Sequence, residues 1–233
     1  MRHRLTNSRD NVAMSVVVFD VDGTLTDSEA IWDEVRRGMA ADDGVAWPPD
    51  ATTAMMGMST QEWSTYLVQT VGLPGTAEQA AERTISALHD HYRLHGAPEL
   101  PGASAAVRRM AAQWTVGLAS SSPRVLIDTI IEQLAIGDLV TTSVSTEEIG
   151  GVGKPAPDVY LEVCRRLNAD PARSIAIEDA PNGIRSAHAA GMKVIAVPPH
   201  FHPPTADVLS LAHLVIDSLE ELSVDRIAAL LEA

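Results

Sequence analysis

Two carboxylates, two residues apart, follow the first strongly apolar run of this 233-residue chain. The run covers residues 16–19, and Asp20 and Asp22 come directly after it, before Gly23. Side chains two positions apart in an extended chain point the same way, and glycine then lets the backbone turn sharply. Carboxylates held so close repel each other unless a cation or a proton lies between them. An ordinary Asp-Gly turn after a strand also explains Asp22 and Gly23 on their own.

Three later segments also carry polar side chains that suit a phosphate or a metal ion. Ser120 and Ser121 precede a predicted helix, whose free backbone N–H groups favour an anion, although a serine there is also a common helix cap. Lys154 is one of two lysines among 17 basic residues, and an ammonium is a compact charge suited to a phosphoryl oxygen or a carboxylate. Glu178 and Asp179 form a second acidic pair after an apolar run. Such a set predicts a magnesium site for phosphoryl transfer.

Alternating apolar runs and helical segments must bring these side chains together. The predicted strands cover residues 16–19, 114–119, 140–144, 174–177, 193–197 and 214–216. Helices between the later strands predict an α/β fold with a Rossmann-like parallel sheet, whose strands share one carboxyl edge. Residues 29–95 differ, because apolar residues such as Ile31, Val35 and Met39 recur there every four positions. We therefore expect a small helical insertion after the first strand.

The motifs, in this order, resemble those of the haloacid dehalogenase superfamily, in the β-phosphoglucomutase-like branch with a helical cap after the first motif. They are Asp-x-Asp-Gly-Thr at 20–24, Ser120, Lys154-Pro155 and the acidic pair 178–179. Segments 27–33, 117–120 and 153–158 look most like the hexitol and 2-deoxyglucose-6-phosphate phosphatases. The resemblance spans nearly the whole chain. It implies a discontinuous core of residues 1–27 and 99–233, with an α-helical cap domain at 28–98.

The resemblance also implies roles for the acidic residues. Asp20 would attack phosphorus and form an aspartyl-phosphate, and Asp22 would act first as general acid and then as general base. Mg²⁺ would be held by the Asp20 carboxylate, the Asp22 backbone carbonyl and Asp179. Glu178 would contribute directly or through water. The chain is thus expected to be a Mg²⁺-dependent phosphatase that hydrolyses small phosphomonoesters, with sugar or polyol phosphates as substrates.

The same resemblance assigns the phosphate-binding groups. Ser120, the backbone N–H of Ser121 and Lys154 would hold phosphoryl oxygens. The physics agrees, because an anionic nucleophile approaches a phosphate dianion only when positive charge offsets the repulsion. Trp32 lies just past the first core–cap crossing and is expected to stack on a sugar or polyol, although packing inside the cap is a close alternative.

Two other functions stay open at this point. A β-phosphoglucomutase-type phosphomutase would share the core motifs, but that family carries a histidine in the helix after the first motif and an arginine in the Gly-x-Ser cap loop. This chain has Trp32 and Thr60 at those positions, and both departures favour hydrolysis. A non-catalytic binding protein on the same fold is a further alternative. The complete set of core motifs weighs against it.

Composition limits the partners. Acidic residues outnumber basic ones by 31 to 17, for a formal net charge of -14, whereas nucleic acid and anionic membranes require basic surfaces. No apolar run approaches the roughly 18 residues that span a bilayer. We therefore expect a monomer that binds a small phosphate ester and neither nucleic acid nor membrane. The single cysteine, Cys164, fits a cytoplasmic location.

Residues 1–13 lack the apolar segment of a secretory signal and are expected to be a leader or to precede the true start at Met14.

Overall fold

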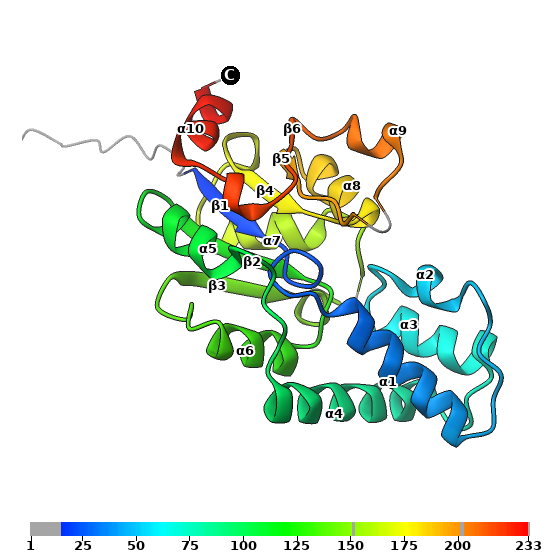
Figure 1. Cartoon of the computed structure of the whole chain (residues 1–233). Coiled ribbons are helices and arrows are strands. Elements are labelled where there is room, and N and C mark those ends of the chain that lie inside the picture. The colour runs from blue at the N-terminus through cyan, green and yellow to red at the C-terminus, as the bar shows by residue number, and fades with distance from the viewer. Residues whose placement is uncertain (1–14, 151, 201–202, 233) are drawn as a thin grey trace, which may run out of the picture.

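Six parallel strands form the centre of the molecule, and helices cover both faces of the sheet (Figure 1). A computed structural model describes residues 15–150, 152–200 and 203–232, so the expectation for residues 1–13 lies outside the described part. The strands are β1 (Val16–Phe19), β2 (Thr115–Ser120), β3 (Val140–Ser145), β4 (Ile175–Glu178), β5 (Lys193–Ala196) and β6 (Leu214–Val215). Their order is β3-β2-β1-β4-β5-β6, and every neighbouring pair is parallel. The predicted α/β class with a Rossmann-like sheet is confirmed.

The first strand is apolar at every position because both of its faces are covered. Val17 and Phe19 pack into the apolar layer on one face, and Val16 and Val18 into the layer on the other. On the first face lie α5 (Ala103–Ala111), α6 (Arg124–Gln133) and α10 (Val224–Glu232). On the second lie α7 (Asp158–Arg166), α8 (Pro181–Ala189) and α9 (Ala206–Leu209).

Two of these helices, α5 and α9, were not predicted from the sequence. Helix α5 is rich in alanine, and its buried stripe of Ala103, Ala106, Val107 and Met110 gives only a weak apolar periodicity. Helix α9 has four residues, which is too short for such a pattern to show. The predicted buried thiol is confirmed, because Cys164 lies inside the apolar layer beneath α7.

Residues 29–95, which we call the helical lobe, lie to one side of the sheet (Figure 1). Its helices are α1 (Glu29–Asp42), α2 (Ala51–Met55), α3 (Thr60–Tyr66), a π-helical turn (Leu67–Val71) and α4 (Ala77–His95). Helices α3 and α4 each begin with a capping box, formed by Ser59 with Glu62 and by Thr76 with Gln79. These caps fix where the loops of the lobe end.

The apolar stripe predicted for α1 is only partly right. Met39 is buried, and Ile31 and Val35 are partly buried against the same apolar core, but the buried positions also include Trp32 and Arg36. Helix α1 packs against α4 and also lines a cavity that it shares with the sheet. A single-sided stripe therefore does not describe it, and the face turned toward the sheet carries polar residues.

Two adjacent crossings connect the helical lobe to the sheet. The amide of Asp27 donates to the Pro98 carbonyl at 2.8 Å, and the amide of Leu100 donates to the Leu25 carbonyl at 3.0 Å. The outgoing and returning chains thus lie side by side and hold each other. Among the described residues, no helix is long and apolar enough to cross a membrane.

Candidate active site

The acidic residues gather where β1 and β4 lie next to each other at the centre of the sheet. The strand order reverses its direction at this pair, and in parallel sheets such a point leaves a crevice at the carboxyl ends. Asp20 follows β1 directly, Glu178 ends β4, and Asp179 comes next. The Asp20 amide donates to the Ile177 carbonyl at 3.0 Å, which continues the pairing of the two strands up to the site. Residues 158 positions apart in the chain thus meet through the topology alone.

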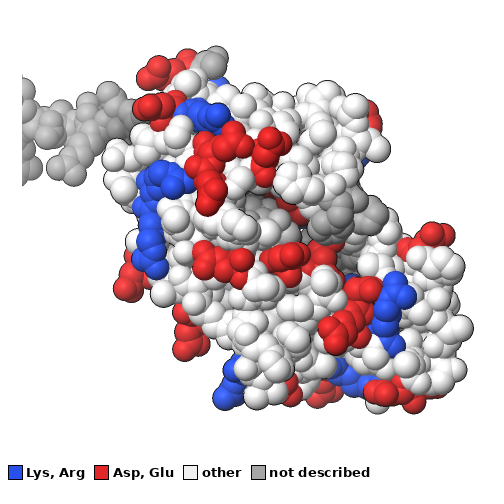
Figure 2. All heavy atoms as spheres, in the orientation of Figure 1, with Lys and Arg blue, Asp and Glu red and all other residues white. Residues whose placement is uncertain are grey.

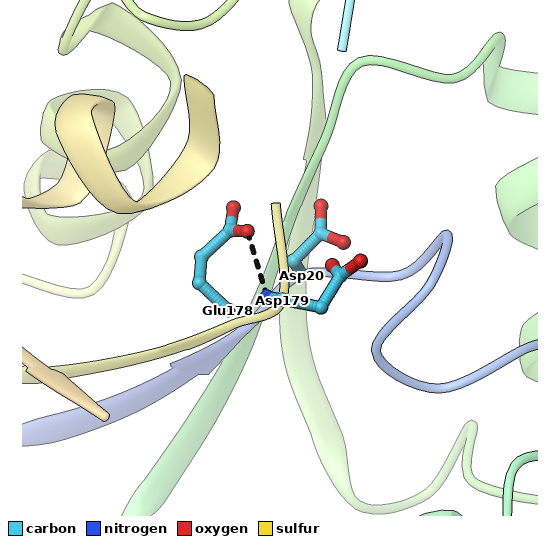
Figure 3. Close-up of side chains that lie close together, drawn as sticks. All are labelled: Asp20, Glu178 and Asp179. Atoms are coloured by element: carbon cyan, nitrogen blue, oxygen red, sulfur yellow. Dashed lines mark hydrogen bonds between the residues drawn. The ribbon is translucent and has the colours of Figure 1, made fainter. Parts of the chain in front are cut away.

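The carboxylates of Asp20, Glu178 and Asp179 form one buried cluster (Figure 3). An oxygen from each lies within 4.8 Å of the others. Burial raises the pKa of Asp20 to about 7, although Lys154 opposes the change, and burial with the neighbouring carboxylates raises the pKa of Asp179 well above its usual range. Three hard oxygen donors that repel one another fit a divalent cation such as Mg²⁺. This cluster contains three of the four predicted metal-binding residues.

Two glycines allow the cluster to be so compact. Gly23 has a φ of +87°, and a Cβ there would overlap the Asp179 carboxylate, whose Oδ1 accepts a hydrogen bond from Thr24 Oγ1 at 3.0 Å. At Gly183, in the first turn of α8, a Cβ would overlap the Glu178 carboxylate. Backbone without side chains therefore forms part of the wall around both acidic groups.

Lys154 lies between two of the carboxylates. Its Nζ donates to Asp20 Oδ1 at 2.5 Å, to Glu178 Oε1 at 2.7 Å and to the Ala119 carbonyl at 3.1 Å. Burial disfavours the charged ammonium, but the two carboxylates more than offset this and raise the pKa of Lys154. The Tyr160 hydroxyl donates to the same Glu178 oxygen at 2.7 Å. The lysine therefore stays charged at the floor of the site.

The Asp22 side chain points away from the acidic cluster. Its Oδ1 accepts hydrogen bonds from Ser28 Oγ at 2.7 Å and Trp32 Nε1 at 3.4 Å. Its Oδ2 accepts from Ser122 Oγ at 2.6 Å and Ser120 Oγ at 3.4 Å. The Asp22 carboxylate is thus separate from the metal-binding oxygens, and the predicted ligand role of its backbone carbonyl stays a prediction. Donors from both α1 and the end of β2 hold this side chain in place.

One cavity between the sheet and the helical lobe collects most of the predicted residues. Its walls include Asp20, Asp22, Trp32, Ser121, Lys154 and Glu178. Ser120 is buried beside it, and Asp179 faces a second cavity on the far side of the cluster, together with Gly23 and Thr24. Among the charged side chains on the face drawn in Figure 2, acidic ones predominate over basic ones, in agreement with the net charge of -14.

The sequence did not single out three residues of this site. Ser122 belongs to the same run of serines as Ser120 and Ser121, and only the turn into α6 decides which hydroxyl reaches Asp22. Tyr160 lies on the buried face of α7. Arg36 lines the cavity from α1, four residues after Trp32. A basic residue one helical turn from a predicted binding residue is the signal that could have identified it.

The loop before α3 rests on the sheet side of the cavity. Ser121 Oγ donates to the Gly57 carbonyl at 3.4 Å, and Thr60 Oγ1 donates to Glu147 Oε1 at 2.9 Å. Gly57 has a φ of +76°, and a Cβ there would lie 3.2 Å from the Asn182 side chain. These contacts close the cavity opposite α1.

Comparison with known proteins identifies the family. A family model for haloacid dehalogenase-like hydrolases matches residues 14–191, and the chain therefore belongs to this family. A bifunctional riboflavin kinase/FMN phosphatase of Arabidopsis thaliana is 30% identical over 217 residues, covering 91% of this chain and 55% of that protein. The chain thus spans about half the length of that relative. Hexitol phosphatase B of Escherichia coli is 32% identical over 216 residues, covering 88% of this chain and 93% of that protein.

A solved structure agrees with the fold. The crystal structure of β-phosphoglucomutase from Clostridium difficile matches with a TM-score of 0.79 and 21% identity, covering 94% of this chain and 97% of that one. The predicted superfamily and its helical-cap branch are confirmed, as is the prediction of a haloacid dehalogenase-type hydrolase. Relatives named as phosphatases support the expected class of phosphomonoester hydrolases.

Proposed function

We propose that this chain is a Mg²⁺-dependent phosphatase that hydrolyses small phosphomonoesters, with sugar or polyol phosphates as substrates, through an aspartyl-phosphate on Asp20. The observation that carries the proposal is the position of Asp20, which lines the cavity, accepts a hydrogen bond from Lys154 and belongs to one cluster with two further carboxylates. A buried carboxylate beside a fixed cation and a cation-binding cluster is equipped to attack phosphorus. The relative named hexitol phosphatase B supports a polyol phosphate as substrate.

Asp20, Asp179, Glu178 and the Asp22 backbone carbonyl would hold the Mg²⁺ ion. When bound, the ion supplies positive charge that offsets the repulsion between the carboxylate and the phosphate. Lys154, whose Nζ donates to Asp20, adds to that charge. Because Lys154 also bonds Glu178, the lysine keeps this carboxylate turned toward the cluster.

Asp22 would transfer the proton in both chemical steps. Asp20 forms a bond to phosphorus while the bond to the leaving oxygen breaks, and Asp22 donates a proton to that oxygen. Asp22 then takes a proton from water, whose oxygen attacks the aspartyl-phosphate and releases inorganic phosphate and free Asp20. The contacts of Asp22 with Ser28 and Ser122 hold its carboxylate outside the metal cluster, as both roles require.

Binding of the substrate is assigned to both sides of the cavity. Ser120, the Ser121 backbone N–H and Lys154 would hold phosphoryl oxygens, and Trp32 would contact the sugar or polyol. Residues 28–98 would form the cap domain over a core of 1–27 and 99–233. The adjacent crossings at Asp27 and Pro98 support this division. The monomeric state, the cytoplasmic location and the absence of nucleic-acid and membrane partners stay predictions.

Hydrolysis is favoured over phosphomutase activity by two positions. Trp32 stands where the mutases carry a histidine, and its Nε1 is directed to Asp22. Thr60 stands where they carry an arginine, and its hydroxyl is bonded to Glu147. Neither side chain offers a cation for a second phosphate of a sugar bisphosphate at these positions.

The test is release of inorganic phosphate from a panel of sugar, polyol and aryl phosphates, with and without Mg²⁺. We expect Mg²⁺-dependent hydrolysis by the wild type and none by Asp20→Asn, because an amide is a poor nucleophile. Asp138→Asn makes the same change at an exposed site and is the matched control. Retention of a tenth of wild-type turnover by Asp20→Asn would remove Asp20 as the nucleophile. Conversion of a hexose 1-phosphate into its 6-phosphate without phosphate release would favour the mutase.

A further inference from the structure

Arg36 is a buried cation in the cavity wall, and in the described part of the chain its Nε lacks a hydrogen-bond partner. The residue is 8% exposed. Its guanidinium carbon lies 4.5 Å from the centre of the Trp32 ring and 4.9 Å from that of Trp63. Within residues 15–150, 152–200 and 203–232, its Nε is buried without a partner, and none of its nitrogens forms an ion pair. A buried charge without hydrogen bonds is costly, so the site favours a ligand that supplies them.

The nearby carboxylates do not fill this role. Asp33 accepts hydrogen bonds from Arg37 Nε, at 2.5 Å, and from Thr52. Asp22 is held by serine and tryptophan donors, as described above. Burial, together with two other acidic groups, raises the pKa of Glu29 to about 7 and so weakens it as a permanent counter-ion.

The guanidinium itself is poorly compensated. Burial lowers the pKa of Arg36 to about 9, even though Asp33, Asp22 and Glu29 all act in the opposite direction. The surroundings therefore supply less negative charge than the buried cation needs. Lys154, the other cation of the cavity, already has Asp20 and Glu178 as partners. Arg36 is thus the cation of this cavity that is left for a ligand.

We propose that Arg36 binds a second anionic group of the substrate, a carboxylate or a second phosphate, on the helical side of the cavity. The substrates would then be phosphorylated sugar acids or sugar bisphosphates in preference to neutral sugar and polyol phosphates. A planar guanidinium bonds either group through two parallel N–H donors. The Trp32 and Trp63 rings, whose centres lie 5.7 Å apart edge to face, both contact the guanidinium and so restrict where it can lie. The inference rests on the proposed phosphatase function.

Two matched pairs of substrates test the proposal on the Mg²⁺-supplemented wild type. The first pair is 6-phosphogluconate and glucitol 6-phosphate, which differ only in a carboxylate against a hydroxymethyl group at C1. The second is glucose 1,6-bisphosphate and glucose 6-phosphate. Hydrogen bonds to charged groups predict that kcat/KM favours the anionic member of at least one pair by about tenfold to a hundredfold. The pair that shows the preference distinguishes a carboxylate from a phosphate.

Variants then connect the preference to Arg36. Arg36→Gln should lower kcat/KM far more for the anionic member and bring the ratio within the pair close to one, mainly through KM. Arg36→Lys keeps the charge without the planar fork and should retain part of the ratio. Arg93→Gln, which makes the same change at an exposed arginine in the last turn of α4, is the control and should leave the ratio unchanged. Thermal unfolding of each variant shows whether it is folded.

The outcomes separate this inference from the proposed function. Hydrolysis without preference in either pair overturns the role of Arg36 and leaves the phosphatase intact. An equal loss on both members in Arg36→Gln also overturns it, since the arginine would then serve packing or the reacting phosphate. Failure of the wild type to hydrolyse any ester overturns the proposed function instead. If Arg36→Gln does not fold, the kcat/KM ratios of the wild type and of Arg36→Lys still test whether Arg36 binds the second anionic group.

Discussion

Replacement of Lys154 by methionine tests how much the lysine charge stabilises the buried carboxylates of the site. The lysine Nζ lies 2.5 Å from Asp20 and 2.7 Å from Glu178, and its side chain is 4% exposed. Methionine preserves most of the buried length but leaves two buried carboxylates without their counter-ion. Removing one partner of a buried ion pair costs about 3–5 kcal/mol. For a chain of this size, that loss lowers Tm by about 6–20 °C when both carboxylates are ionised.

The loss of stability should depend on pH in a defined direction. The pKa of Asp20 is already raised to about 7 by burial, and it should rise further once Lys154 no longer opposes that effect. A carboxyl group whose pKa is higher in the folded state than in the unfolded state binds a proton on folding in that interval. Protonation removes the uncompensated charge, so the destabilisation should be small at about pH 5 and should grow as the pH rises through about 7 to 8.

Thermal unfolding followed by circular dichroism, with chelator present, measures this difference for wild type and Lys154→Met. Lys193→Met is the matched control, because Lys193 is the other lysine and its Nζ donates to the Leu230 carbonyl. Lys193 begins β5 beside the first residue of β4, whereas the acidic cluster lies at the carboxyl ends of the strands. The effect of Lys193→Met on Tm should not change with pH. A Tm loss below about 2 °C for Lys154→Met at pH 8, or an equal loss at both pH values, would refute the charge compensation described here.

Three further predictions concern the metal site, Trp32 and Gly23. Chelation of Mg²⁺ should abolish hydrolysis, and activity that survives exhaustive chelation would contradict the proposed metal dependence. Ca²⁺ should compete with Mg²⁺ and inhibit, since the larger Ca²⁺ ion, with its looser coordination geometry, fits the same oxygens without aligning the reactants. Trp32→Leu removes the aromatic face at a site that is 9% exposed, so kcat/KM should fall more for the best sugar phosphate than for an aryl phosphate. Equal losses on both substrates would assign Trp32 to packing or to its hydrogen bond with Asp22 instead of substrate contact. Gly23→Ala should reduce turnover by about a hundredfold or more, because the added Cβ would overlap the Asp179 carboxylate. Gly38→Ala is the control and should keep wild-type turnover, because a Cβ at Gly38 has no neighbour within 4 Å.

The sequence was informative about the acidic cluster because each member lies at the end of a strand. A strand buried on both faces reads as an uninterrupted apolar run, and its first polar residue marks the carboxyl edge of the sheet. Asp20 and Asp179 could therefore be placed together without any knowledge of distances. The prediction depended on topology, which the alternation of strands and helices largely determines.

The cavity side of α1 could not be predicted in the same way. Periodicity identifies which residues of a helix share a face, but it does not tell which of several neighbours that face meets. The predicted stripe through Ile31 and Val35 does pack against the apolar core, but the structure also buries Trp32 and Arg36, which the stripe did not include. One is a tryptophan and the other a charged arginine, and their burial can be explained only when the opposite wall of the cavity is known.

Helix α1 links recognition of the substrate to the proposed acid–base group. It begins at Glu29, directly after the motif that contains Asp22, and it carries Trp32 and Arg36 one turn apart on the same face. Trp32 Nε1 donates to Asp22, and the Arg36 guanidinium lies against the Trp32 ring. Because the two side chains share one helix face and contact each other, a change in the position of one affects the other. An anion bound by Arg36 would therefore also hold Trp32 where it donates to Asp22, so that a substrate with the right second group would help to orient the acid that protonates its leaving oxygen.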